Sequence, residues 1–417
     1  MAEPATAPAL DFLEVELPEG FNDPIGEEFE IRPMVLPMGP SHPAMHGTVR
    51  IVLKLEGETV VDADVQVGYL HRGFEKECES GTWEQAIPYT DRLNYNSAII
   101  CNLGYCLAVE KLLGIEVPPR AQALRVLASE LSRMGDHFTC VGAGGLELGA
   151  MSAFLYAVEA REMLWDLVED LCGARVTNNY VRIGGLSQDL REGFADRLKT
   201  TFAKVDELYS DVDKLLTANR IFVDRLKNTG LLSKDRAIAW GQTGPVLRAT
   251  GVPYDIRKAF PYSGYERYDF DVPVGSVGDN YDRFLIRMEE LRQSIRIIEQ
   301  VLKDLPGGPV NVDDPKVRWP AKTRVFTRME ELIDQFMLVT GGIRVPAGEG
   351  YVAVEGANGE LGFYVVSDGS GHPVKMRCRS PSFANTSALR EMIIGSMIAD
   401  IIPTFDLLNM IGGECDR

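Results

Sequence analysis

Two histidines in a proline-rich loop are the residues best suited to chemistry. The loop has the sequence GPSHPAMHG over residues 39–47 and contains His42 and His46, two of only five histidines in the chain. Proline fixes φ, so this loop can hold both imidazoles in fixed orientations. An imidazole titrates near neutral pH and can donate a hydrogen bond or relay a proton. Both histidines could instead cap turns, and the prolines argue against the helix that a metal-ligand spacing of four residues would need.

Three other polar residues could contribute to a ligand site. Arg72 follows an expected strand, and its permanent charge could stabilise an anionic neighbour, although surface solvation is the alternative. Tyr95 stands at the head of an expected helix and carries a phenol that can donate a hydrogen bond to a carbonyl or quinone oxygen. Glu147 lies in the glycine-flanked apolar stretch GGLELGAM, where burial would raise its pKa or require a partner.

The apolar pattern predicts a mainly helical α+β scaffold for these residues. Alternation over 47–68 predicts a hairpin, and alternation over 351–379 predicts a three-stranded meander. Helical spacing dominates from residue 92 onward, and its clearest example is an amphipathic helix over 281–305. A further helix is expected over about 385–399.

The same pattern divides the chain into four expected parts. They are an acidic N-terminal arm (1–30), a β-rich part with the histidine loop (31–90), a helical bundle (91–345) and a C-terminal α+β part with the meander (346–417).

Composition excludes several classes of protein. The 417 residues carry 43 basic and 61 acidic side chains, a net charge of −18 that repels nucleic acids and anionic lipids. The apolar stretch 392–411 contains Asp400, Pro403 and Asp406, so we expect no membrane span. Seven scattered cysteines without a CxxC pair predict neither a disulfide framework nor a zinc or iron–sulfur site held by this chain alone.

Several blocks of sequence together resemble the 49-kDa (D) subunit of respiratory complex I, the proton-pumping NADH:quinone oxidoreductase. The resemblance runs from about residue 32 to 417 with the blocks in the same order. They are GPSHPAMHG, GYLHRGFEK, PYTDRLNY, AVEKLLGIEVPPRA, ARVTNNYVRIGG, LRATGVPYDIRKAFPYSGYERYDFDVPVG, RIIEQ, GELGFYVVSDGS and GECDR. The family is related to the large subunit of nickel–iron hydrogenases. The resemblance therefore implies a hydrogenase-like helical bundle with small antiparallel sheets near both ends.

The hydrogenase relation also supplies an alternative function. A hydrogenase would carry RxCxxC and DPCxxC motifs, because four thiolates hold its nickel and iron. Residues 92–97 read RLNYNS here, and the C-terminal region offers only Cys415, so this soft-ligand site cannot form. A subunit of a related hydrogenase-like or non-NADH-fed oxidoreductase is the alternative, and a purely structural scaffold is a third possibility.

The resemblance implies a role for each candidate residue. His46 and Tyr95 would hydrogen-bond the two carbonyl ends of a quinone, either ubiquinone or menaquinone. His42 is expected to be structural because proline flanks it. Glu147 stands where the family commonly has Asp, the charged partner of the quinone-site histidine. Arg72 would lie beside a 4Fe–4S cluster held by the B subunit, so that this chain itself would bind no metal.

The resemblance also implies partners and a location. The B, C and I subunits and the H subunit of the membrane arm would hold the chain peripherally on the cytoplasmic side of the inner (plasma) membrane. Electrons from NADH would reach the quinone, coupled to proton translocation. Thr177 stands where many members carry a histidine beside the cluster. That histidine takes up a proton when the cluster is reduced. Because threonine cannot do so, we expect a weak pH dependence of the cluster potential.

Overall fold

The computed structural model describes residues 33–40 and 47–417. The expected acidic arm over 1–30 and the loop residues His42 and His46 lie outside the described residues.

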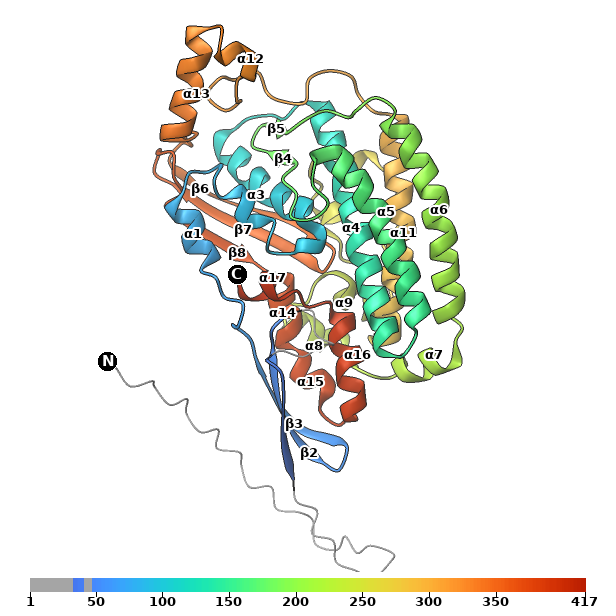
Figure 1. Cartoon of the computed structure of the whole chain (residues 1–417). Helices are drawn as coiled ribbons and strands as arrows, with labels where there is room; N and C mark the ends of the chain where they lie inside the picture. Colours follow the sequence, from blue (N-terminus) through green and yellow to red (C-terminus); the bar gives the residue numbers. More distant parts are fainter. Residues whose placement is uncertain (1–32, 41–46) are drawn as a thin grey trace, which may run out of the picture.

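Long helices form the body of the molecule, as expected (Figure 1). They are α3 (Ala98–Leu113), α4 (Pro119–Glu147), α5 (Met151–Cys172), α6 (Phe194–Leu216) and α11 (Asn280–Lys303). Helix α4 is central, since it packs against α5 on one side and α11 on the other, while α6 packs on α5. It begins at Pro119, whose missing N–H costs nothing in the first turn of a helix.

Within the residues that the structure describes, three small antiparallel sheets complete the fold, which confirms a mainly helical α+β class. The strands are β1 (Met34–Met38), β2 (Arg50–Glu56) and β3 (Thr59–Gln66) in the first sheet, β4 (Val181–Arg182) and β5 (Gly185–Leu186) in the second, and β6 (Gly348–Gly356), β7 (Gly359–Ser367) and β8 (Lys375–Arg379) in the third. The expected hairpin and meander are both present, and β1 adds an edge strand to the hairpin.

Short helices connect these parts. They are α1 (Phe74–Ser80), α2 (Ile87–Thr90), the 3-10 turn η1 (Tyr95–Ser97), α7 (Arg220–Leu226), α8 (Lys234–Ala239), α9 (Gly244–Ala249), α10 (Ile256–Ala259), η2 (Tyr265–Arg267), α12 (Lys322–Val325), α13 (Met329–Gly341), α14 (Pro381–Ser387), α15 (Leu389–Ile393), α16 (Ile398–Leu408) and α17 (Gly412–Asp416). The single helix expected over 385–399 is wrong. Gly395 adopts a φ of 83°, and the chain turns there between α15 and α16.

The C-terminal segment folds back into the centre of the molecule, where α17 lies beside α14 (Figure 1). Its Asp416 carboxylate accepts hydrogen bonds from the backbone N–H groups of Gly68 (2.9 Å) and Leu70 (2.8 Å). The end of the chain thereby anchors the segment that carries Arg72. Among the described helices, none has the length and apolar character that crossing a bilayer would require.

Candidate functional site

Tyr95 is the first residue of the short turn η1, which leads into α3. The side chain of Asn94 caps this turn by accepting a hydrogen bond from the N–H of Asn96 (3.1 Å). Asp136, a buried residue of α4, accepts hydrogen bonds from Asn94 Nδ2 (2.7 Å) and Ser97 Oγ (2.9 Å). These hydrogen bonds fix the turn to the bundle. The phenol of Tyr95 stays accessible, since this residue is 38% exposed.

Arg72 contacts the segment that leads into this turn. Its Nη2 donates a hydrogen bond to the carbonyl oxygen of Arg92 (2.7 Å), three residues before Tyr95. The backbone N–H of Arg72 donates to the carbonyl oxygen of Arg417 (3.3 Å). The structure therefore brings the Arg72 segment, the Tyr95 turn and the C-terminus together, although they are far apart in the sequence.

Glycines allow a further backbone segment to reach this place. A Cβ added at Gly413 would lie 2.5 Å from the carbonyl oxygen of Arg92, so no side chain fits there. Gly47 has a φ of 133°, and a Cβ added to it would lie 2.9 Å from the backbone nitrogen of Gly412. Gly47 follows the loop that contains the candidate histidines, so the end of that loop lies against the terminal segment.

Glu147 is the last residue of α4, and its side chain is exposed rather than buried. It follows Asp136 by eleven residues, which corresponds to about 16 Å along the helix axis. The candidate residues are therefore spread along α4, with the Tyr95 turn at Asp136 and Glu147 at the end of the helix.

Asp406 on α16 is a carboxyl group near Glu147 that sequence reasoning did not select. Burial raises the pKa of Asp406 well above its usual value, and the charge of Glu147 raises it further. Neither side-chain oxygen of Asp406 has a hydrogen-bond partner within residues 33–40 and 47–417. Asp406 therefore holds its proton more tightly than an ordinary aspartic acid does. Its only signal in the sequence was an isolated acid in an apolar stretch.

The carboxyl and phenol groups around Tyr95 hold protons more tightly than usual. Burial raises the pKa of Glu414 to about 7, and the negative charge of Asp136 raises it as well. Hydrogen bonds from Ser382 lower this pKa, but by less. Burial also raises the pKa of Tyr95, and Asp136 adds to this effect. Tyr95 is consequently protonated at neutral pH and available as a hydrogen-bond donor.

A second group of buried ionisable side chains lies beside the other part of α4, and the sequence analysis missed it. We call it the paired-charge cluster, and its members are Glu130, Arg133, His137, Arg248, Asp255, Arg257, Glu290 and Glu355. Glu130 lies 3.2 Å from Arg133 and 3.1 Å from Arg257. It also accepts hydrogen bonds from Tyr265 Oη (2.7 Å) and Ser294 Oγ (2.6 Å).

Arg248 connects two further acids of the cluster. Its guanidinium lies 2.5 Å from Glu290 and 2.8 Å from Glu355, and His137 Nε2 lies 2.7 Å from Glu290. The cluster thus ties α4, α9, α10, α11 and β6 together through fully buried ion pairs. Residues this far apart in the sequence carry no local pattern that would have revealed their pairing.

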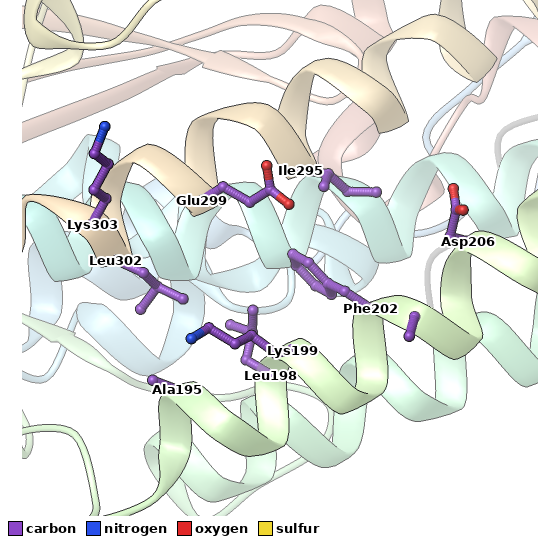
Figure 2. Close-up of a pocket in the computed structure, with 10 residues that line it drawn as sticks. Ala195, Leu198, Lys199, Phe202, Asp206, Ile295, Glu299, Leu302 and Lys303 are labelled. Carbon is purple, nitrogen blue, oxygen red and sulfur yellow. The ribbon is translucent and has the colours of Figure 1, made fainter.

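Two cavities differ in their position relative to the candidate residues. One of about 750 Å³ lies between α6 and α11, where Phe202 and Ile295 contribute apolar surface and Glu299 a carboxylate (Figure 2). Another, of about 430 Å³, lies beside Arg72 and is lined by His71, Gly73, Glu75, Lys76, Lys375, Arg377, Asp416 and Arg417. In the part of the chain that the structure describes, no group of three or more His, Cys, Asp or Glu residues is arranged to hold a metal ion.

Thr177 lies in the segment after α5. Its φ of 49° is in the left-handed region, which a β-branched residue rarely adopts. The side chain is half-buried.

Comparison with known proteins gives a consistent picture. The family model for the respiratory-chain NADH dehydrogenase 49 Kd subunit matches residues 147–417. The chain is 54% identical to the D 1 subunit of NADH-quinone oxidoreductase from Sorangium cellulosum, over 98% of both chains. It is 52% identical to the D subunit from Myxococcus xanthus, over 98% of this chain and 100% of the relative. A C/D subunit from Bdellovibrio bacteriovorus is 48% identical over 96% of this chain and 72% of the relative. The chain therefore belongs to the family of the 49-kDa (D) subunit of NADH-quinone oxidoreductase, and is a component of that oxidoreductase complex.

Proposed function

We propose that this chain forms the site at which the complex reduces quinone, with Tyr95 and His46 as donors to the two carbonyl oxygens of the headgroup. Adding two electrons to a quinone creates two basic oxygens, and positioned acids lower the barrier to protonating them. The main support for this proposal is that Tyr95 has an accessible phenol, which stays protonated and lies on a turn fixed to α4. His46 is included because Gly47, its neighbour in sequence, packs against the terminal segment next to the Arg92 carbonyl.

Arg72 would face the electron donor in this arrangement. A 4Fe–4S cluster of the B subunit would supply the electrons, and a cation nearby favours the reduced, more negative state. Arg72 is held by its hydrogen bond to the Arg92 carbonyl, which fixes its charge close to the Tyr95 turn. The exposed position of Arg72 leaves this charge available to a neighbouring protein of the complex.

Glu147 would respond to the change of charge during quinone reduction. Proton transfer from His46 and Tyr95 leaves uncompensated charge. The charge of Glu147 helps to raise the pKa of the buried Asp406, and this coupling offers a route by which that change can spread. We propose this charge shift as the signal for proton translocation. Glu147→Gln should lower the number of protons pumped per NADH in reconstituted vesicles, and unchanged stoichiometry would contradict the role.

Contacts with other proteins of the complex would hold the chain at the membrane. Helices α12 and α13 project from the body (Figure 1), and apolar side chains there are exposed, including Phe326 (83%) and Phe336 (63%). Exposed apolar clusters of this kind mark protein interfaces. The name C/D of the Bdellovibrio relative supports the C subunit as one neighbour. We propose the B and I subunits and the H subunit of the membrane arm as the others, with peripheral attachment on the cytoplasmic side of the inner membrane.

Two variants test the quinone site in the assembled complex. With electron input held constant, His46→Ala and Tyr95→Phe should each lower quinone reduction at least about a hundredfold, the usual contribution of a positioned acid. Tyr89→Phe is the matched control, because Tyr89 is 39% exposed and lies six residues before Tyr95. Full activity in both site variants would indicate a structural scaffold instead.

A further inference from the structure

We infer that Asp136 is a positioning residue, which sets the orientation of Tyr95 in the quinone site. This inference rests on the proposed function of Tyr95. Asn94 immediately precedes Tyr95, and Ser97 ends the same turn. Both donate to a single oxygen of Asp136, Oδ2, at 2.7 and 2.9 Å. One carboxylate thus clamps the turn at both ends and leaves Tyr95 little freedom to rotate as part of the turn.

The third hydrogen bond of Asp136 joins the turn to the C-terminal region. Asn409 caps the end of α16 in a left-handed conformation, with a φ of 53°. Its Nδ2 donates to Asp136 Oδ1 (2.8 Å) and to Asn358 Oδ1 in the β6–β7 turn (2.6 Å). The orientation of Tyr95 therefore depends on three segments that meet at Asp136.

Only a carboxylate satisfies these three donors at once. Asp136 is fully buried, and its hydrogen-bond partners within the described residues are all neutral. An ionised carboxylate accepts on both oxygens, whereas an amide has one accepting oxygen and two N–H donors. Asp136→Asn would therefore turn an N–H group either towards Asn409, which would then lose its acceptor, or towards the Tyr95 turn, where Asn94 and Ser97 would both lose theirs.

The test measures quinone kinetics in the assembled complex. Asp136→Asn should raise the KM for a soluble short-chain quinone about tenfold, the effect of losing one well-placed hydrogen bond. NADH oxidation with an artificial acceptor that takes electrons upstream of quinone should be unchanged. A solely structural defect would lower both rates together and leave the KM unaltered, so this split distinguishes positioning from folding.

A paired exchange provides the rescue. Asn409→Asp alone would set two carboxylates 2.8 Å apart and should impair the complex. In the double variant Asp136→Asn/Asn409→Asp, the amide at 136 can donate to the carboxylate at 409 and still accept from Asn94 and Ser97. Asn358 can rotate to present its Nδ2, which has no hydrogen-bond partner among the described residues. The double variant should recover most of the lost quinone affinity.

The outcomes separate this inference from the proposed function. If Tyr95→Phe leaves quinone reduction intact, the role of Tyr95 fails. If Tyr95→Phe impairs it but Asp136→Asn leaves the KM unchanged, the positioning role alone is overturned. Should Asp136→Asn prevent assembly, Ser97→Ala removes only one donor to Asp136 and should still raise the KM, by about threefold. An unchanged KM in that variant would also overturn the inference.

Discussion

Glu130 and Asp136 lie six residues apart on α4, and both are fully buried, yet their surroundings differ. Glu130 is flanked by Arg133 and Arg257 in the paired-charge cluster. Asp136 meets only neutral donors within the described residues, and the nearby acids Asp406 and Glu414 likewise have no ion pair there. We call Asp136, Asp406 and Glu414 the acid-rich region.

The difference between the two regions appears in the pKa values. Burial raises the pKa of Glu130, but Arg133 and Arg257 more than compensate and lower it to about 2. Burial raises the pKa of Glu414 to about 7, because no neighbouring cation outweighs it. Buried acids with cations are fixed in one charge state and hold helices together. Glu414, which has no ion pair among the described residues, can exchange a proton near neutral pH, which suits the quinone site that we propose here.

The largest effect should follow from breaking the paired-charge cluster. Glu130→Ala leaves Arg133 and Arg257 buried without their shared partner, which should cost about 3–5 kcal/mol in folding free energy. Calorimetry of the assembled complex would show this as a marked fall in melting temperature or as failure to assemble. A melting temperature equal to that of the unmodified complex would show that the cluster contributes no stability.

A smaller, pH-dependent effect is expected in the acid-rich region. The folded state raises the pKa of Glu414 to about 7, so it binds the proton more tightly than the unfolded state does. Stability attributable to this group is therefore present below about pH 4.5 and is lost as the pH rises to about 7.

Glu414→Gln removes this titration. Its melting temperature should exceed that of the unmodified complex at pH 8 but not at pH 4.5. The corresponding difference in the free energy of unfolding at pH 8 is on the order of 1–3 kcal/mol. Glu414 accepts hydrogen bonds from Ser382, and glutamine retains an accepting oxygen. A stability difference independent of pH would contradict the raised pKa.

An ion pair between a half-buried glutamate and exposed arginines should matter much less than either buried region. Glu331 lies 3.4 Å from Arg324 and 3.8 Å from Arg328, whose side chains are both largely exposed. Glu331→Gln should change stability by less than about 1 kcal/mol, because water screens the pair. A loss as large as that of Glu130→Ala would show that burial does not explain the contrast.

No pH response is expected at Thr177. A hydroxyl cannot take up a proton in the physiological range, so the potential of the 4Fe–4S cluster that we propose beside this residue should vary little with pH. A redox titration of the assembled complex tests this. A slope near 59 mV per pH unit would contradict the prediction, because it requires about one proton per electron.

Helices and strands were predictable where the apolar pattern of adjacent residues indicates them. The helix expected over 281–305 is α11 at Asn280–Lys303, and the meander forms as the alternation indicated. The helix expected over 385–399 was wrong, because apolar residues on both sides of Gly395 conceal a turn. Arg72 and Tyr95 were selected separately, and the contact of Arg72 with the Arg92 carbonyl, three residues before Tyr95, could not be read from spacing.

The sequence by itself determined the residue types, and with them the family and the absence of the thiols that a hydrogenase needs at positions 94 and 97. Only the tertiary structure decided what Asn94 and Ser97 do instead, which is to donate to Asp136 from about forty residues away. It also decided which buried acids have cations beside them. The physical reason is that a pKa and a hydrogen bond depend on neighbours in space, and packing brings those neighbours from segments that no local pattern connects.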